Sequence, residues 1–287
     1  MGEDISASDR WVIPASVLQH IPGCAGGEAP MSFQLLHGGR DVNRNLRIDT
    51  RAGRFVLRQR IREGPRPGAD PLSEVACHRA AAAAAVAPAV LDAAPDGSWI
   101  LMDYVEGGMW TPQRLQAPEG LRTLGACLQR LHATTPPKGL AAFDPVSIAR
   151  GLAQAILERY PAAAAKVNAL VARTRQLALD CAAFAVTPVT THGDLNASNL
   201  VGPAPMLVDW EYAQLADPVY DLACLSVYYP GLRPRSEELL GSTGITDADG
   251  AVRLRLHAQL FDSLNRLWEQ AETSLQAERN SNAPRKH

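Results

Sequence analysis

Apolar and polar residues alternate one for one in the first third of the chain. Leu46 and Ile48 alternate with polar neighbours, and Phe55 and Leu57 repeat the pattern. This period of two residues is typical of a strand with one buried face. We therefore expect short antiparallel strands joined by turns, one of them at residues 95–97. The predicted strands cover residues 33–36, 45–49, 54–60, 89–92 and 98–104.

The apolar spacing lengthens to three and four residues elsewhere, most clearly at Leu121, Leu124, Leu128 and Leu131. That spacing places side chains on one face of an α-helix. Ser73 is the expected N-cap of a helix that runs through an alanine-rich stretch. The predicted helices cover residues 14–20, 73–86, 121–131, 146–159, 162–184 and 252–274.

This order of elements predicts two domains. The predicted strands lie within residues 1–105, with one helix inserted among them, and residues 106–287 are mainly helical. The glycine pair at 107–108 is a natural hinge between them. We expect an α+β protein with a small β-rich N-terminal lobe and a larger, mainly helical C-terminal lobe.

Composition narrows the class of protein. Hydrophobic residues make up 46% of the 287 residues, enough for sizeable cores, and the net charge of −2 gives no attraction to nucleic acid or anionic lipid. The five cysteines include no CxxC pair, which argues against a disulfide framework or a zinc site. The first ten residues are polar, and the longest apolar run, 80–91, is too short to span a bilayer. We expect a cytoplasmic protein without nucleic-acid or membrane partners.

Two short apolar segments, Leu200-Val201 and 206–208, flank a Gly/Pro turn and predict a β-hairpin. Paired strands lie about 4.8 Å apart, so the hairpin brings Asn199 close to Asp209. An amide oxygen beside a carboxylate suits Mg²⁺, which takes oxygen ligands and keeps waters and phosphate oxygens as the others.

Asp194 precedes Asn199 with the spacing Asp-x-x-x-x-Asn. Kinases use this spacing for a carboxylate that accepts the proton of the attacking hydroxyl and an amide that holds a metal ion. The spacing alone also occurs in ordinary Asn/Asp-rich turns. Its combination with the hairpin that ends at Asp209 favours phosphoryl transfer, which needs positioning and charge neutralisation.

The segments His-Gly-Asp-Leu-x-x-x-Asn at 192–199 and Val-Asp-Trp-Glu at 208–211 resemble the aminoglycoside phosphotransferase and choline kinase superfamily. Residues 209–213 and 217–223 are most similar to its bacterial choline kinase and thiamine kinase branch. The likeness extends over about residues 35–229. It implies a protein-kinase-like two-lobe fold and the use of ATP and Mg²⁺, with Asp194 as the catalytic base and Asn199 and Asp209 at the metal.

The resemblance also implies a set of nucleotide-binding residues in the first part of the chain. A glycine-bearing loop over the phosphates is expected at 38–45, although an ordinary hairpin turn has the same composition. Arg58 would bind phosphate oxygens and Glu74 would be its partner, unless they are a solvated strand residue and a glutamate that favours the helix N-terminus. The implied nucleotide-binding residues are Gly39, Asn43, Arg58, Glu74, Asp103, Tyr104 and Val105.

The resemblance places the acceptor near Trp210, Glu211 and Tyr212, where aromatic faces beside a carboxylate would suit a cation. These aromatic residues could equally belong to the core. Asp221 and His192 are implied to support the catalytic loop. His132, at the end of a leucine-rich helix, is interpreted as a C-terminal capping histidine.

The predicted function is therefore a small-molecule kinase that phosphorylates a hydroxyl of choline, ethanolamine or thiamine, acting as a monomer or homodimer. The alternatives are an aminoglycoside or sugar phosphotransferase and an inactive nucleotide-binding protein of the same fold. A protein kinase is disfavoured because Asp-Phe-Gly is lacking and no Ala-Pro-Glu segment follows Asp209, the one at 117–119 lying before the catalytic stretch.

Overall fold

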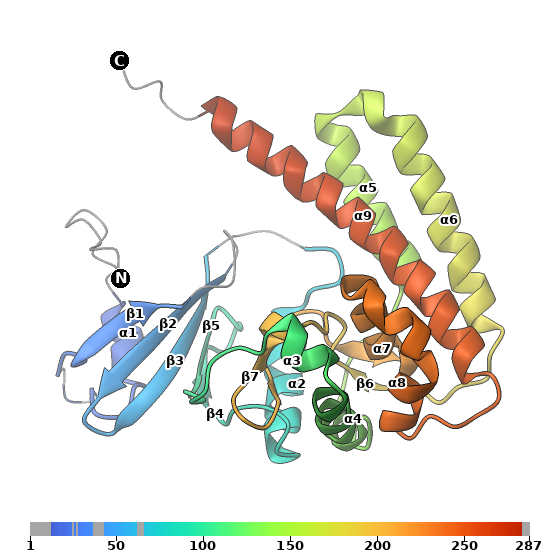
Figure 1. The fold of residues 1–287 in the computed structure, drawn as a ribbon. Coiled ribbons are helices and arrows are strands. Elements are labelled where there is room, and N and C mark those ends of the chain that lie inside the picture. The colour runs from blue at the N-terminus through green and yellow to red at the C-terminus, as the bar shows by residue number, and fades with distance from the viewer. Residues whose placement is uncertain (1–12, 25, 27, 37–42, 62–65, 283–287) are drawn as a thin grey trace. The chain divides into compact units, whose positions relative to one another are not determined.

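The computed structural model describes residues 13–24, 26, 28–36, 43–61 and 66–282, with side chains as far as residue 273 (Figure 1). The chain divides into two compact units. The first comprises Met1–Glu63 and Ala89–Tyr104, and the second comprises Gly64–Pro88 and Val105–His287. The division near residue 105 was expected from the sequence, but segment 64–88 with its helix groups with the second unit and not with the first.

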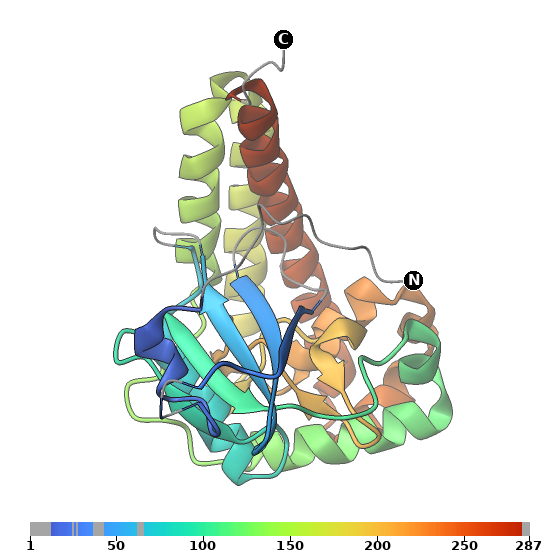
Figure 2. The same ribbon diagram turned by 90° about the vertical axis from the view of Figure 1, so that its left-hand side faces the viewer.

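The first unit contains a five-stranded sheet with the order β1-β2-β3-β5-β4, and every neighbouring pair is antiparallel (Figure 2). The predicted α+β class and all five predicted strands are confirmed, with ends that differ by at most two residues. The strands are β1 (Ser32–Leu35), β2 (Asn43–Thr50), β3 (Gly53–Arg60), β4 (Val90–Ala93) and β5 (Trp99–Asp103).

One face of this sheet carries the core of the first unit. Leu46, Ile48 and Leu57 are almost fully buried, as their alternation with polar residues predicts. Val17 and Ile21, in and after the short helix α1 (Ala15–Leu18), belong to the same cluster. The described residues before the first strand therefore pack on this sheet and stabilise it.

The second unit is mainly helical. Its α-helices pack through amphipathic faces whose apolar residues recur every three or four positions. The helices are α2 (Pro71–Ala83), α3 (Pro112–Gln116), α4 (Pro118–His132), α5 (Pro145–Arg159), α6 (Ala164–Ala182), α7 (Val219–Tyr228), α8 (Ser236–Ser242) and α9 (Gly250–Asn282). Among the described residues, no helix combines the length and the apolar character that crossing a bilayer requires.

Helix α2 begins earlier than the sequence indicated. Its N-cap is Asp70, whose carboxylate accepts hydrogen bonds from the backbone N–H groups of Leu72 and Ser73. Pro71 then occupies the first helical position, where its fixed φ and missing N–H are tolerated. Ser73 is therefore inside the helix, and the expectation that it forms the cap is wrong.

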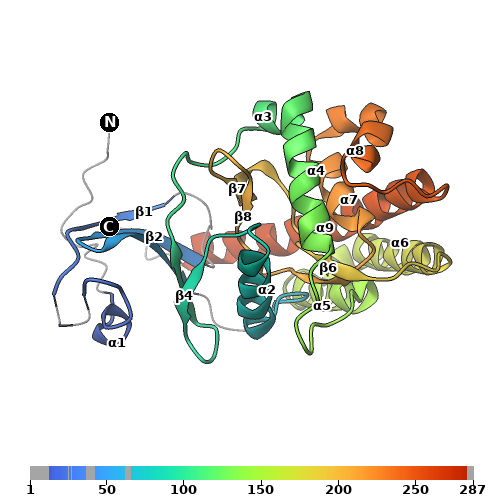
Figure 3. The same ribbon diagram turned by 90° about the horizontal axis from the view of Figure 1, so that it is seen from below.

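Helices α5, α6 and α9 pack side by side as a three-helix group (Figures 1 and 2). Leu152, Ile156, Val167 and Leu267 supply buried apolar side chains to a cluster of their own. Helix α9 also packs against α7. Because α7 follows the candidate catalytic stretch in sequence, α9 connects the three-helix group to the part of the unit that carries the site (Figure 3).

Two small antiparallel sheets hold the candidate catalytic stretch. The predicted hairpin is present as β7 (Leu200–Val201) and β8 (Met206–Leu207), with Leu200 opposite Leu207. The second sheet, β6 (Val189–Thr191) with β9 (Gln214–Ala216), was not predicted from sequence. Each of its strands has three residues, too few to display a period.

Candidate active site

The loop that carries Asp194 begins where β6 ends. Gly193 has a φ of +81°, and a Cβ atom at this position would lie 2.2 Å from the carbonyl oxygen of Tyr212. Only glycine combines this backbone conformation with so close an approach. The turn therefore presses the loop against the backbone of the segment that follows Asp209.

Asp221, in the first turn of α7, anchors this loop through hydrogen bonds to its backbone. It is fully buried, and its carboxylate accepts hydrogen bonds from the backbone N–H groups of His192 (3.0 Å) and Gly193 (3.1 Å). His132 Nε2 lies 3.0 Å from the other carboxylate oxygen. The contact shows that the side chain of His132 is directed at Asp221, so its interpretation as a helix cap is wrong.

His192 connects the loop to the hairpin. Its Nε2 donates to the backbone carbonyl of Val208 at 2.9 Å, while the backbone N–H of Asp194 points at its Nδ1 at 3.4 Å. Since a carbonyl can only accept, the Nε2 atom carries the hydrogen. The imidazole therefore positions Val208, the residue before Asp209, relative to the backbone of Asp194.

Asn199 and Asp194 are held together directly. The amide nitrogen of Asn199 donates to the backbone carbonyl of Asp194 at 2.8 Å and lies 3.3 Å from its carboxylate oxygen Oδ2. Asn199 in turn accepts at its carbonyl the backbone N–H of Val208, at 3.0 Å. The structure thus brings the loop and the hairpin together, as the spacing predicted.

The oxygen atoms at this place match the preferences of Mg²⁺. The amide nitrogen of Asn199 faces Asp194, which leaves the amide oxygen for a cation, and Asp209 adds a carboxylate. Within the described residues there is no group of three His, Cys, Asp or Glu that could hold a metal. An amide and a carboxylate completed by phosphate oxygens and water suit magnesium better than zinc.

Asp209 adopts a left-handed backbone conformation, with φ of +69°. Asp is among the few residues other than glycine that tolerate this region, at some cost in energy. Its negative charge also acts on Asp194 and contributes to the raised pKa of that carboxyl. A bound cation between the two carboxylates would remove this repulsion.

The surroundings of Asp194 shift the pKa of its carboxyl in opposite directions. Burial raises the pKa of its carboxyl, while the hydrogen bond from Tyr228 lowers it, and the net direction is upward. The Tyr228 hydroxyl donates to Asp194 Oδ1 at 2.6 Å. Tyr229, the next residue, accepts the backbone N–H of Ala197 with its hydroxyl at 2.7 Å. The end of α7 thus supports the loop and its carboxylate.

A cavity of about 160 Å³ opens at Asp194 within the second unit. Its walls come from the catalytic stretch, from α5, α7 and α9, and from Pro67 and Phe143, and they include several aromatic side chains. Among the described residues that line it, Asp194 and Glu211 are the acids. Trp268 on α9 is 39% exposed. The aromatic residues that line it are Phe143, Tyr212, Tyr220, Tyr228, Phe261 and Trp268.

Glu211, expected at the acceptor, is engaged by a residue that sequence reasoning missed. Arg66 Nη1 donates to Glu211 Oε2 at 2.6 Å, and Arg66 Nη2 donates to the Tyr212 hydroxyl at 3.1 Å. Burial opposes the charge of Arg66, but Tyr212 and Glu211 outweigh it and leave the pKa of the guanidinium raised. This pair spans 145 positions of the chain, which no local pattern could indicate.

Trp210 does not line this cavity. Its ring is 1% exposed, packs 4.9 Å from the His192 ring between centroids, and donates from Nε1 to the carbonyl of Leu207 at 3.1 Å. The expectation that Trp210 binds the acceptor is therefore wrong, because the side chain belongs to the core beneath the loop. Glu211 and Tyr212 do line the cavity.

Two of the residues expected at the nucleotide lie on paired strands of the first unit. Asn43 begins β2 opposite Arg60, and Arg58 lies in β3 between Asn45 and Ile100. Gly39 lies outside the described residues. Glu74 belongs to the second unit, in the first turn of α2. The pairing of Arg58 with Glu74 therefore stays a prediction.

The remaining nucleotide-binding candidates lie where the two units join in sequence. Asp103 ends β5, and the backbone N–H of Tyr104 donates to the carbonyl of Arg54 at 3.2 Å. The Arg47 guanidinium lies over the Tyr104 ring, 4.9 Å from its centroid. Val105 is the first residue of the second segment of the second unit.

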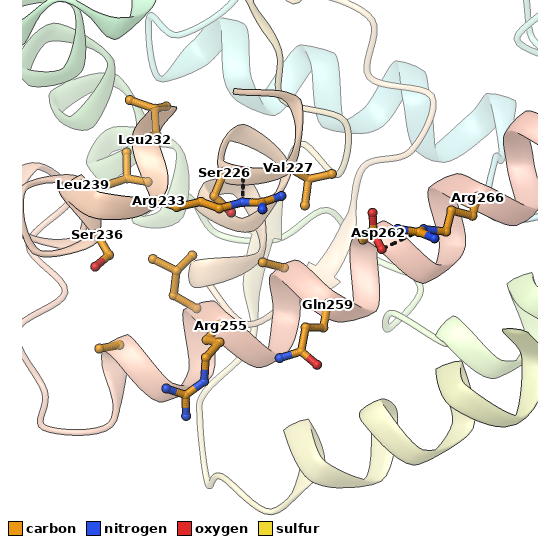
Figure 4. Close-up of a pocket in the computed structure, with 13 residues that line it drawn as sticks. Ser226, Val227, Leu232, Arg233, Ser236, Leu239, Arg255, Gln259, Asp262 and Arg266 are labelled. Carbon is orange, nitrogen blue, oxygen red and sulfur yellow. Dashed lines mark hydrogen bonds and ion pairs between the residues drawn. The ribbon is translucent and has the colours of Figure 1, made fainter. Parts of the chain in front are cut away.

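A larger cavity, of about 560 Å³, lies elsewhere in the second unit, among α7, α8 and α9 (Figure 4). Arg233, Arg255 and Arg266 line it, and Arg266 is paired with Asp262 at 2.9 Å. None of its described lining residues comes from the loop that carries Asp194. The smaller cavity is therefore the one that adjoins the candidate catalytic group.

Comparison with known proteins agrees with this geometry. A family model described as "Phosphotransferase enzyme family" matches residues 32–257, which is more than half of the chain. No curated protein sequence matches the chain.

Solved structures share the fold. A choline/ethanolamine kinase family protein from Mesorhizobium loti has a TM-score of 0.68 at 23% identity, covering 94% of this chain and 87% of that one. Choline kinase LicA from Streptococcus pneumoniae has a TM-score of 0.69 at 17% identity, covering 91% of each chain. A macrolide 2′-phosphotransferase from Brachybacterium faecium has a TM-score of 0.61 at 20% identity, covering 95% of this chain and 99% of that one.

At these identities the structural likeness establishes a kinase-like fold and not an acceptor. The family model, by contrast, covers the catalytic stretch, the hairpin and the aromatic end of α7. The chain therefore belongs to the phosphotransferase enzyme family.

Proposed function

We propose that the protein is an ATP- and Mg²⁺-dependent kinase that phosphorylates the hydroxyl of a small cationic alcohol of the choline, ethanolamine or thiamine type. The observation that carries the proposal is the Asp194 carboxylate, which Tyr228 and Asn199 hold at the wall of an aromatic cavity that also contains Glu211. Aromatic faces beside a carboxylate suit an ammonium group.

Each group has one role in this proposal. The acceptor's hydroxyl oxygen bonds to the γ-phosphorus of ATP, the bond from that phosphorus to the β–γ bridging oxygen breaks, and ADP leaves. Asp194 accepts the hydroxyl proton. Asn199 and Asp209 would hold Mg²⁺, which when bound neutralises charge on the phosphate oxygens. His192 and Asp221 keep the loop in place.

The nucleotide would be bound by the candidate residues between Gly39 and Val105. Arg58 would contact phosphate oxygens with Glu74 as its partner, and Gly39 and Asn43 would contribute to phosphate binding. Backbone groups of Asp103, Tyr104 and Val105 would hold adenine. The solved structure of LicA in complex with AMP supports nucleotide binding by this fold.

The acidity of the cavity favours a single positive charge on the acceptor. Among its described lining residues Asp194 and Glu211 are the acids, and Arg66 already pairs with Glu211. A polycationic aminoglycoside would need more carboxylates than these to replace its hydration. We therefore favour small monocations over aminoglycosides as the acceptor.

The test is an ADP-release assay with Mg-ATP and choline, ethanolamine, thiamine, kanamycin, erythromycin and small sugars. We expect one of the first three to stimulate turnover. Asp194→Asn, which keeps the shape of the side chain, should lower kcat by about 10² to 10⁴ without changing ATP affinity. Asp249→Asn, on an exposed residue, is the matched control.

Near-native turnover in Asp194→Asn would show that Asp194 is not the base. Stimulation by kanamycin or erythromycin alone would replace the proposed acceptor class. ATP binding without stimulation by any of the three cationic alcohols would also reject that class.

A further inference from the structure

Arg66 presents a positive charge to the two residues best suited to bind the acceptor's cation. Its guanidinium carbon lies 5.6 Å from the centroid of the Tyr212 ring, and its Nη1 atom is 2.6 Å from Glu211 Oε2. A carboxylate and an aromatic face are the partners that proteins offer to ammonium ligands. In this structure both partners already hold a cation from the chain itself.

The contact is shielded from water. The side chains of Arg66 and Glu211 are 12% and 9% exposed, so the attraction between them is screened less than at an open surface. Two directed bonds, to Glu211 and Tyr212, hold the planar guanidinium in one orientation. Arg66 is therefore a defined partner of Glu211 and not a loosely placed surface charge.

Arg66 is also tethered. It lies five residues before the start of α2, in the segment Gly64–Pro88 that belongs to the same unit as Glu211. A tethered group has a high effective concentration at its partner, so a free ligand must overcome it. Loops between elements rearrange more readily than the elements themselves, which allows such an exchange.

The other acid of the cavity cannot take over the role of Glu211. Asp194 accepts the Tyr228 hydroxyl at one carboxylate oxygen and lies 3.3 Å from the Asn199 amide nitrogen at the other. It must also remain near the reacting hydroxyl in the proposed function. Glu211 is thus the counter-ion for a cationic acceptor among the described lining residues.

We propose that Arg66 is a specificity-determining residue: its guanidinium competes with the acceptor's ammonium group for Glu211 and Tyr212. This inference rests on the proposed function in that it concerns the same acceptor cavity. An acceptor cation must displace Arg66 before it pairs with Glu211. An uncharged alcohol of the same shape does not meet this competition.

The test compares the binding of choline with that of its uncharged isostere, 3,3-dimethylbutan-1-ol, by calorimetric titration of the full chain. In Arg66→Met we expect choline to bind about tenfold more tightly than in the wild type, and the uncharged alcohol to change by less than about twofold. Arg66→Lys retains the charge and should resemble the wild type. The double variant Arg66→Met/Glu211→Gln should lose the gain.

Kinetics give a second readout. In Arg66→Met the KM for choline should fall while the KM for Mg-ATP stays the same, a split that general loosening of the fold would not produce. If Arg66→Met does not fold, Arg66→Gln removes the charge and keeps a polar side chain.

Equal or weaker choline binding in a folded Arg66→Met or Arg66→Gln variant would overturn the inference, and so would a gain that survives Glu211→Gln. Because binding is measured without phosphoryl transfer, the two proposals fail separately. A wild type that phosphorylates no cationic alcohol rejects the proposed function, whereas unchanged binding in the Arg66 variants rejects competition by Arg66.

Discussion

The Tyr228 hydroxyl opposes the effect of burial on the Asp194 carboxyl. Burial in the cavity wall raises the pKa of the Asp194 carboxyl, and the negative charge of Asp209 acts in the same direction. The hydrogen bonds from Tyr228 and Asn199 lower it, because both favour the ionised carboxylate. In the proposed function Asp194 is the general base and must be ionised before it accepts a proton, so the Tyr228 hydrogen bond keeps it active at lower pH.

Tyr228→Phe tests this balance. Loss of the hydroxyl removes an interaction that lowers the pKa of Asp194, so that pKa rises further. We expect the acid limb of the kcat/KM profile to move to higher pH, with the largest loss of activity under acidic conditions.

Tyr229→Phe is the matched control for that profile, since the Tyr229 hydroxyl bonds the Ala197 backbone and not the carboxylate. It should lower the rate and leave the acid limb where it was. Superimposable profiles of Tyr228→Phe and the wild type would show that Tyr228 does not tune the base.

At the level of elements, α7 and α9 are joined by a buried ionic cluster. Asp217, just before α7, receives Arg253 Nη1 at 2.5 Å and lies 3.6 Å from His257 Nε2. The side chains of Asp217 and Arg253 are 10% and 5% exposed. Since α7 carries Asp221 and Tyr228, this cluster supports the elements that position the catalytic loop.

Arg253→Met should destabilise the protein by about 3–5 kcal/mol, because it removes the guanidinium that bonds both oxygens of the buried Asp217 carboxylate. Arg255→Met, two residues along α9 at an exposed position (Figure 4), should change stability by less than about 0.5 kcal/mol. Urea unfolding followed by circular dichroism measures both. Equal midpoints for the two variants would contradict a role for the cluster.

The same cluster predicts a response to acid. Burial opposes ionisation of Asp217, but its interactions with His257 and Arg253 outweigh burial and lower its pKa. A carboxyl with a lowered folded-state pKa adds stability above its unfolded pKa, and this stability is lost as the pH falls through the folded-state pKa. We expect the wild type to lose stability below about pH 4, and Arg253→Met to lose less over that range.

At the level of the molecule, each unit has its own core, and the proposed kinase uses residues of both. The first unit is built on an antiparallel sheet with an apolar cluster, and the second is built on helices around the catalytic stretch. A ligand that binds the folded chain and not the unfolded one stabilises it by mass action. Nucleotide binding is therefore visible in unfolding experiments before any acceptor is known.

Mg-ATP at about 100 times its Kd should stabilise the protein by about 2.7 kcal/mol, which corresponds to a rise in Tm of about 5 °C or more. Chelation of magnesium by EDTA should remove much of this rise. Asp209→Asn should behave with magnesium as the wild type does with EDTA. An ATP-induced shift that is indifferent to both would contradict the metal roles of Asn199 and Asp209.

The strands, the main helices and the β7–β8 hairpin could be predicted from sequence because their signals are local. Alternation at Leu46 and Ile48 identifies a strand, and recurrence at Leu124 and Leu128 identifies a helix, since each period matches the geometry of its element. The β6–β9 sheet could not be predicted, because a three-residue strand shows no period. The α2 cap was misplaced because Asp70 and Ser73 are both good capping residues.

The sequence by itself determined the candidate catalytic stretch, because Asp194, Asn199 and Asp209 lie within one loop and one hairpin whose geometry follows from short-range backbone pairing. Tertiary structure alone decided what surrounds them. Tyr228 reaches Asp194 across 34 positions, His132 reaches Asp221 across 89, and Arg66 reaches Glu211 across 145. Such pairs arise from how helices and loops pack, so the environment of the acceptor follows from the fold. The class of reaction, by contrast, is indicated by the local spacing of residues.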